Sequence, residues 1–156
     1  MKIFLITLAA LLLPGTQAIA ATQEAVTVSP AGSQPTTLGA PEYFTGTAKV
    51  DSRFKGSPPA RISGGTVSFE AGARTAWHTH PLGQTLIVSS GTGWVQEWEK
   101  SAQPIKTGDV VWIPPGVKHW HGASATEPMV HIAVSESQDG KTVTWMEKVT
   151  DDQYPR

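Results

Sequence analysis

The chain has 156 residues, with 12 basic and 13 acidic side chains and no cysteine. This near-neutral balance offers no basic face to a phosphate backbone, so we expect no nucleic-acid partner. The lack of cysteine excludes disulfides, zinc–thiolate sites and a thiol nucleophile. The 15 glycines and 12 prolines favour short strands and tight turns over long helices.

Residues 1–20 have the layout of a secretory signal peptide. Lys2 supplies a positive charge, residues 3–13 form an apolar run, and the small residues Ala18 and Ala20 precede the expected cleavage point. The apolar run is shorter than the ~20 residues that cross a bilayer. We therefore expect cleavage, a periplasmic or secreted mature protein, and no membrane contact after cleavage.

Residues 21–41 are rich in Ala, Thr, Ser, Gln and Pro, which predicts a flexible N-terminal arm with a short pairing strand at 25–28. Residues 42–156 are then expected to form one domain. Short runs rich in Val, Ile, Thr and aromatic residues, separated by Gly or Pro, predict an antiparallel all-β sandwich or barrel. The predicted strands are 43–50, 62–69, 85–89, 94–98, 110–113, 130–134 and 142–145, with one turn at 150–154.

Histidine is absent from residues 1–77 and occurs at positions 78, 80, 119, 121 and 131. On an extended chain, His78 and His80 point to the same face, and so do His119 and His121. A single histidine would be interpreted as an ordinary core or surface residue. Two pairs that a barrel can bring together predict a metal site instead, because imidazole is the commonest biological metal ligand.

Two motifs surround these pairs. The pattern G-x5-H-x-H-x3-Q-x6-G runs from Gly72 to Gly91, and G-x5-P-x-G-x2-H runs from Gly108 to His119. Together they resemble the two signature motifs of the cupin superfamily. The resemblance implies a single-domain, all-β fold, the double-stranded, jelly-roll-like cupin β-barrel, with one divalent metal ion. The metal ligands that it implies are His78, His80, Gln84 and His119.

The chain departs from the usual cupin pattern at two positions. Gln84 stands where the family usually has Glu, and Ala123 stands where an Asn often follows. Three imidazoles and an amide leave the full charge of a divalent ion, which favours Lewis-acid over redox chemistry. This indicates lyase, isomerase or hydrolytic chemistry. An iron-dependent cupin dioxygenase and a non-catalytic, small-molecule-binding cupin remain open alternatives.

A closer resemblance covers residues 43–47, 73–88, 118–123, 129–131 and parts of 145–154. These segments are similar to bacterial cupin hydroxynitrile lyases. The resemblance implies manganese as the metal, although Fe, Co, Ni and Zn also suit such a site. It further implies reversible cleavage of a cyanohydrin to an aldehyde and hydrogen cyanide, and therefore a small carbonyl or cyanohydrin substrate.

Two histidines remain once the implied ligands are assigned. His121 shares a strand face with His119, and His131 lies in an apolar strand where a buried polar ring needs a partner. Both are candidate acid–base groups because neither has a carboxylate beside it in the sequence. The alternatives are that His121 orients the His119 ring and that His131 is a structural core residue.

The residues beside the implied ligands face away from them. We expect Trp77, Trp112 and Trp120 to pack in the core or at a subunit interface. Arg74 could reach an anionic substrate, but no second basic residue accompanies it, so we expect a solvated strand residue. Small cupins pair through a sheet face or a swapped N-terminal strand, and the arm is long enough for this. We therefore expect a homodimer or homotetramer.

Overall fold

The structure is a computed structural model that describes residues 25–155, so the expected signal peptide at 1–20 lies outside the described residues. Within this range all the regular elements are β-strands, and no helix of a length and apolarity suited to crossing a membrane occurs. The strands are β1 (Thr37–Leu38), β2 (Phe44–Thr45), β3 (Ala48–Lys55), β4 (Ile62–Phe69), β5 (Arg74–Thr75), β6 (His78–Thr79), β7 (Gln84–Glu97), β8 (Gln103–Lys106), β9 (Val110–Ile113), β10 (His119–Ala123), β11 (Met129–Glu136) and β12 (Thr144–Trp145). The predicted all-β fold is confirmed.

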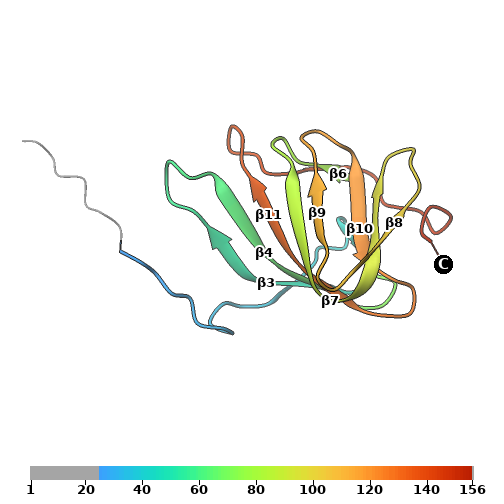
Figure 1. The fold of residues 1–156 in the computed structure, drawn as a ribbon, viewed down its shortest axis with the longest axis horizontal. Helices are drawn as coiled ribbons and strands as arrows, with labels where there is room; N and C mark the ends of the chain where they lie inside the picture. The colour runs from blue at the N-terminus through green and yellow to red at the C-terminus, as the bar shows by residue number, and fades with distance from the viewer. Residues whose placement is uncertain (1–24, 156) are drawn as a thin grey trace, which may run out of the picture.

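The strands form one curled antiparallel sheet with two halves (Figure 1). The first half contains β1, β3, β4, β11 and β9 with the beginning of β7. The second half contains β2, β5, β10, β6, β12 and β8 with the end of β7. Strand β7 pairs with β11 and β9 in the first half and with β10 and β8 in the second. It therefore joins the two halves of the barrel.

Strand β7 replaces the two strands that the sequence predicts at 85–89 and 94–98. The glycine and threonine residues at 91–93 looked like a turn, but the chain continues through them as a bend within one strand. Gly91 has a φ of 78°, and a Cβ on it would lie 1.9 Å from the carbonyl oxygen of Pro128. Only glycine allows this backbone approach, so the bend depends on it.

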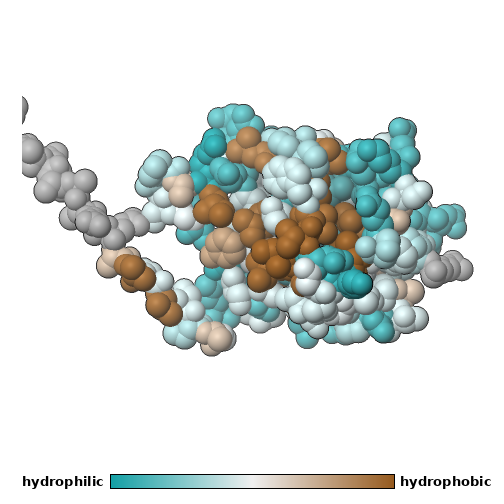
Figure 2. All heavy atoms as spheres, in the orientation of Figure 1, coloured by the Kyte–Doolittle hydropathy of each residue, from teal (hydrophilic) through white to brown (hydrophobic). Residues whose placement is uncertain are grey.

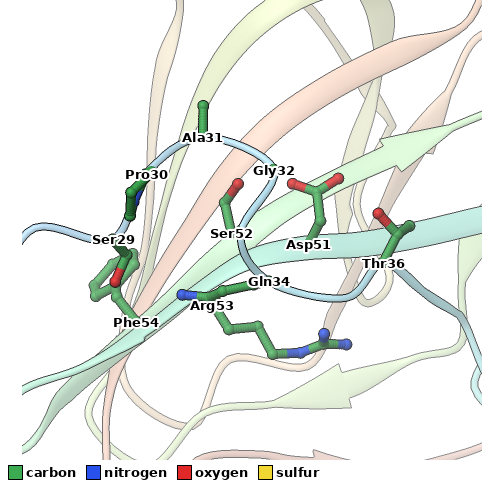
Figure 3. Close-up of a pocket in the computed structure, with 10 residues that line it drawn as sticks. All are labelled: Ser29, Pro30, Ala31, Gly32, Gln34, Thr36, Asp51, Ser52, Arg53 and Phe54. Atoms are coloured by element: carbon green, nitrogen blue, oxygen red, sulfur yellow. The ribbon is translucent and has the colours of Figure 1, made fainter.

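The N-terminal segment differs from expectation in where it pairs. Residues 25–28 are not a strand, because they lie beyond the sheet edge; β1 pairs with β3 instead. Residues 29–36 lie over residues 51–54, and the two segments line a cavity of about 350 Å³ (Figure 3). Val26 and Val28 remain exposed. The segment therefore adds a short edge strand and leaves apolar side chains in solvent.

Apolar side chains of residues 25–155 form two separate cores. The first lies inside the curled sheet and includes Phe69, Leu86 and Met129. The second lies behind β6 and β10, where Trp77 and Trp120 pack with Val149 and Tyr154. These two tryptophans thus face away from the histidines and pack in the opposite layer, as predicted. The turn expected at 150–154 is present, and it closes the second core.

An apolar patch covers the outer face of the first half of the sheet (Figure 2). We define it by Ile87, Val110, Trp112 and Ile132, which adjoin one another across β11, β7 and β9. Trp112 is 59% exposed, so it is not a core residue. A row of exposed apolar side chains on a sheet face is typical of an interaction surface.

Candidate metal centre

Three histidines converge at one end of the curled sheet. His78 on β6 and His119 on β10 are direct partners across the antiparallel pair, and His80 follows β6 by one residue. One ring nitrogen from each lies within 4.8 Å of the others, and all three side chains are buried. The same-face spacing expected of these residues therefore produces a three-histidine cluster, which fits a divalent metal site.

Backbone carbonyls fix the orientation of all three rings. Nδ1 of His78 lies 2.9 Å from the carbonyl oxygen of Ala76, and Nδ1 of His119 lies 2.9 Å from that of Val117. Nδ1 of His80 lies 2.6 Å from the carbonyl oxygen of Thr142. A carbonyl oxygen only accepts, so each Nδ1 carries the hydrogen and donates. Each Nε2 is then left with the lone pair that a metal ion requires.

The remaining implied ligand lies beside this cluster. Oε1 of Gln84 is 3.2 Å from Nε2 of His119, so the amide oxygen and the imidazole nitrogen approach the same point. Nε2 of His80 is buried and has no hydrogen-bond partner in the described part of the chain, which is costly unless a ligand satisfies it. Three imidazole nitrogens and one amide oxygen are a donor set that a divalent ion fits.

Burial keeps the three rings neutral. It lowers the pKa of His119 to about 4, lowers that of His78 well below its usual value, and lowers that of His80 as well. In His78 the neighbouring His119 ring adds to the effect, since two positive charges so close together repel each other. Neutral imidazole is the form that binds metal, so the cluster is ready to bind metal at neutral pH.

The two other histidines form a pair beside the cluster. Nε2 of His131 lies 3.0 Å from Nδ1 of His121, and Phe69 packs against both rings. The His121 ring centroid lies 5.2 Å from that of His78 and 5.9 Å from that of His119. Nε2 of His121 and Nδ1 of His131 are buried and have no hydrogen-bond partner among residues 25–155. The pair therefore brings a free imidazole nitrogen next to the candidate ligands.

Burial also determines the protonation state of this pair. It lowers the pKa of His131 to about 4 and is the main cause of the lowered pKa of His121. The second contribution at His121 comes from the adjacent His131. Both rings are consequently neutral near pH 7, and a neutral ring can take up a proton.

A cavity of about 600 Å³ reaches the cluster from β3, β4 and β11. His80 and Gln84 form part of its wall, together with apolar residues. The apolar residues that line it are Val50, Phe54, Val67, Ala133 and Val143. A second cavity, of about 390 Å³, approaches His119 from the side of β8 and β9. Polar side chains, among them Arg53 and Lys55, also line the first cavity, but most of its accessible surface is apolar, as in small-molecule sites.

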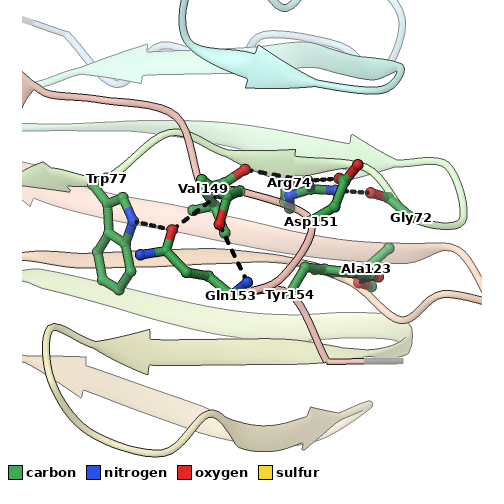
Figure 4. Close-up of polar contacts among 9 residues, drawn as sticks. Gly72, Arg74, Trp77, Ala123, Val149, Asp151, Gln153 and Tyr154 are labelled. Atoms are coloured by element: carbon green, nitrogen blue, oxygen red, sulfur yellow. Dashed lines mark hydrogen bonds and ion pairs between the residues drawn. The ribbon is translucent and has the colours of Figure 1, made fainter.

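Arg74 is not the solvated residue that the sequence suggested. Its side chain is buried, and Nη2 lies 2.6 Å from a carboxylate oxygen of Asp151 and 3.2 Å from the carbonyl oxygen of Val149 (Figure 4). The guanidinium also lies 4.6 Å from the centre of the Tyr154 ring. The expectation was wrong because residues 149–154, distant in sequence, cover this part of β5.

Sequence reasoning missed two groups near the cluster. The Thr142 carbonyl could not be found, because a backbone acceptor leaves no trace in residue type. Trp145 packs against His78, with ring centroids 4.7 Å apart, because β12 pairs with β6. Phe69, at the end of a predicted strand, also contacts the His121–His131 pair.

The fold and this three-histidine cluster identify the class of protein to which the chain belongs, the cupins. The family model described as "Cupin domain" matches residues 65–135, and the chain belongs to the cupins. The resemblance proposed from the two motifs is confirmed. The chain is also similar to an (R)-mandelonitrile lyase of Granulicella tundricola, with 55% identity over 125 residues that cover 80% of this chain and 95% of that protein.

Comparison with solved structures also supports the cupin fold. A cupin-like protein from Thermotoga maritima superposes with a TM-score of 0.71 and 42% identity, over 76% of this chain and 90% of that one. A cupin 2 conserved barrel domain protein from Rhodopseudomonas palustris superposes with a TM-score of 0.60 over 77% of this chain and 80% of that one. The latter is 15% identical, so it supports the fold alone.

Proposed function

We propose that this protein is a metal-dependent hydroxynitrile lyase, which reversibly cleaves a cyanohydrin to an aldehyde and hydrogen cyanide. The similarity to the mandelonitrile lyase, which extends over most of both chains, favours this reaction. The observation in the site that carries the proposal is the His121–His131 pair. It supplies a buried, neutral imidazole nitrogen beside a complete set of candidate metal ligands.

The metal ligands in this proposal are Nε2 of His78, His80 and His119 together with Oε1 of Gln84. A divalent ion bound there, with manganese as our choice, supplies Lewis-acid stabilisation of an alkoxide or carbonyl oxygen. The four ligands are all neutral, so the protein leaves the full ionic charge available for this role.

His121 is the proposed general base. When its Nδ1–H donates to Nε2 of His131, its own Nε2 has a free lone pair. That nitrogen accepts the hydroxyl proton of the cyanohydrin, and the oxygen electron pair then forms the carbonyl double bond. The carbon–carbon bond to the nitrile breaks, and its electron pair leaves with cyanide. Cyanide takes the proton back from His121 and departs as hydrogen cyanide.

The cavity of about 600 Å³ is the proposed substrate site. Its apolar wall suits the aromatic or aliphatic part of a small aldehyde, while His80 and Gln84 mark the end at which the hydroxyl or carbonyl oxygen would lie.

We also propose that the protein is exported and assembles with a second copy of itself. The layout of residues 1–20 supports export, and amino-terminal sequencing of the protein from a periplasmic fraction would test cleavage before Ala21. The apolar patch and the exposed Val26 and Val28 support assembly, because these side chains gain stability when they are removed from water.

The test of the reaction combines metal analysis with turnover. Purified protein is stripped of metal, reloaded separately with Mn²⁺ or Fe²⁺, and assayed for cyanide release from mandelonitrile. We expect one ion per chain and cyanide release with Mn²⁺. Oxygen uptake that depends on Fe²⁺ and substrate, without cyanide release, would indicate a dioxygenase. Metal binding without turnover of any cyanohydrin would indicate a non-catalytic, small-molecule-binding protein.

A further inference from the structure

His80 is oriented differently from the other two histidines of the cluster. His78 and His119 each donate Nδ1–H to a carbonyl two residues earlier, so their orientation is fixed locally. His80 donates to the carbonyl of Thr142, which follows it by 62 residues. The orientation of this one ring therefore depends on the position of a distant segment.

That segment, residues 142–154, is called the strap below. Within it, β12 pairs with β6, so Trp145 lies opposite His78. Beyond β12, Met146 N–H donates to the Trp77 carbonyl at 2.8 Å, and Trp77 N–H donates to the Glu147 carbonyl at 2.9 Å. The strap thus follows the histidine-bearing strand on its outer edge and contacts two of the three histidines of the cluster.

Arg74 anchors the far end of the strap (Figure 4). Its guanidinium donates to the Asp151 carboxylate and the Val149 carbonyl and lies against the Tyr154 ring. Tyr154 O–H in turn donates to the Ala123 carbonyl at 2.7 Å, at the end of the strand that carries His119 and His121. Arg74 is 5% exposed, so without the strap a buried positive charge would lose its carboxylate partner.

We propose that docking of the strap and binding of the metal ion stabilise each other, with Arg74 as a positioning residue that acts through Asp151 and the strap on His80. The inference rests on the metal centre of the proposed function, and it does not depend on the lyase reaction. A docked strap holds His80 in its ligand orientation, and a bound ion fixes His80 and with it the Thr142 carbonyl. Coupling of this kind is reciprocal.

The coupling between the strap and the metal ion can be tested with variants of the full-length protein. Asp151→Asn removes the charge that pairs with Arg74, and the Asp151 side chain is 84% exposed, so folding should tolerate the change. Loss of an interaction that orients a ligand typically lowers metal affinity 10- to 100-fold. We expect Asp151→Asn to weaken Mn²⁺ binding by about 10-fold, measured by competition with a chromogenic chelator. Tyr154→Phe, which removes one hydrogen bond, should weaken it in the same direction.

Glu136→Gln is the matched control, because Glu136 pairs with Arg61 through a similar carboxylate–guanidinium contact at the surface. It should leave Mn²⁺ affinity unchanged. Hydrogen exchange supplies a second readout. Mn²⁺ should slow exchange of the backbone amides of Met146, Gln153 and Tyr154 in the wild type and in the control, and less so in Asp151→Asn.

A purely structural strap predicts other results. Asp151→Asn and Tyr154→Phe would then lower the melting temperature equally with and without Mn²⁺, and would keep wild-type Mn²⁺ affinity. That outcome, or exchange in the strap that Mn²⁺ does not change in the wild type, would overturn the proposal. A wild-type protein that binds Mn²⁺ but cleaves no cyanohydrin would overturn the proposed reaction and leave the coupling intact.

Discussion

His121 and His131 form a buried imidazole pair, with Nδ1 of the first 3.0 Å from Nε2 of the second. Among the described residues, neither of their two outer ring nitrogens has a hydrogen-bond partner. Sequence spacing placed His121 near the candidate ligands, but it did not show that the two spare histidines touch. This contact supports the division of roles in the proposed mechanism, in which His121 takes the proton of the substrate and His131 acts through His121.

The first prediction concerns this pair. His121→Ala and His131→Ala should each keep bound metal near the wild-type level, while cyanohydrin cleavage falls by about 10²–10⁴, the usual contribution of a positioned acid–base group. Metal content and turnover are measured on the same preparation across a metal titration. Turnover that recovers in excess metal would indicate that the residue orients a ligand, and wild-type turnover in both variants would exclude the acid–base role.

The second prediction concerns the cluster itself. The wild type should hold about one divalent ion per chain, because three imidazoles and one amide complete a single set of ligands. His78→Ala and His119→Ala should lose most of this ion and the activity, and elemental analysis of each purified variant measures the loss. His131→Ala is the control that retains the metal. Full occupancy in both ligand variants would show that the ion binds elsewhere.

The third prediction concerns stability and pH in the metal-free protein. Burial lowers the pKa of His119 and His131 to about 4, whereas a histidine in the unfolded chain titrates near 6.5. Between these values the unfolded chain binds more protons, so stability is full above about pH 6.5 and falls as the pH drops towards 4. Each such histidine removes up to about 1.4 kcal/mol per pH unit in this window.

Urea unfolding at pH 7.5, 6.5, 5.5 and 4.5 measures this effect, and His131→Gln should reduce the slope because it removes one titrating group. A denaturation midpoint that stays constant over this range would contradict the buried neutral state. The acid limb of the activity profile should likewise lie below the usual imidazole pKa, since burial lowers the pKa of His121 and His131.

The fourth prediction concerns assembly. Light scattering at assay concentration should show a dimer or tetramer, and Trp112→Lys should shift it towards the monomer, because a buried charge without a partner is costly at an interface. Ile62→Lys is the control, since Ile62 is also a half-exposed apolar residue of the same sheet but lies outside the patch. A monomeric wild-type protein would contradict the proposed self-assembly.

The fold could be predicted where side chains alternate in the usual way for strands. Residues 62–69 and 110–113 form strands with the expected bounds, because their β-branched and aromatic residues suit a pleated, half-buried surface. Strands β5, β6 and β10 were not among the predicted apolar runs, although the histidine spacing already implied extended chain at 78–80 and 119–121. They are short, rich in polar residues and glycine, and are held by neighbours far along the chain.

The site could be predicted as a set of residue types, but its supporting contacts could not. Spacing by two identified which histidines share a face. Arg74 had no local partner in the sequence, because Asp151 lies 77 residues further on. The Thr142 carbonyl had no signal in residue type at all. Contacts of this kind depend on the tertiary fold, and composition and periodicity carry no information about them.

The bend of β7 at Gly91 has a consequence for how the protein folds. A single strand supplies hydrogen bonds to β11 and β9 on one side of the bend and to β10 and β8 on the other. Neither half of the sheet is therefore complete without the other, and most pairings join residues distant in sequence. Such a topology folds slowly, in milliseconds to seconds, and in one cooperative step. His131 pairs with β7 before the bend, and His121 pairs with β7 after it. These two histidines thus meet only as the whole chain reaches its native state.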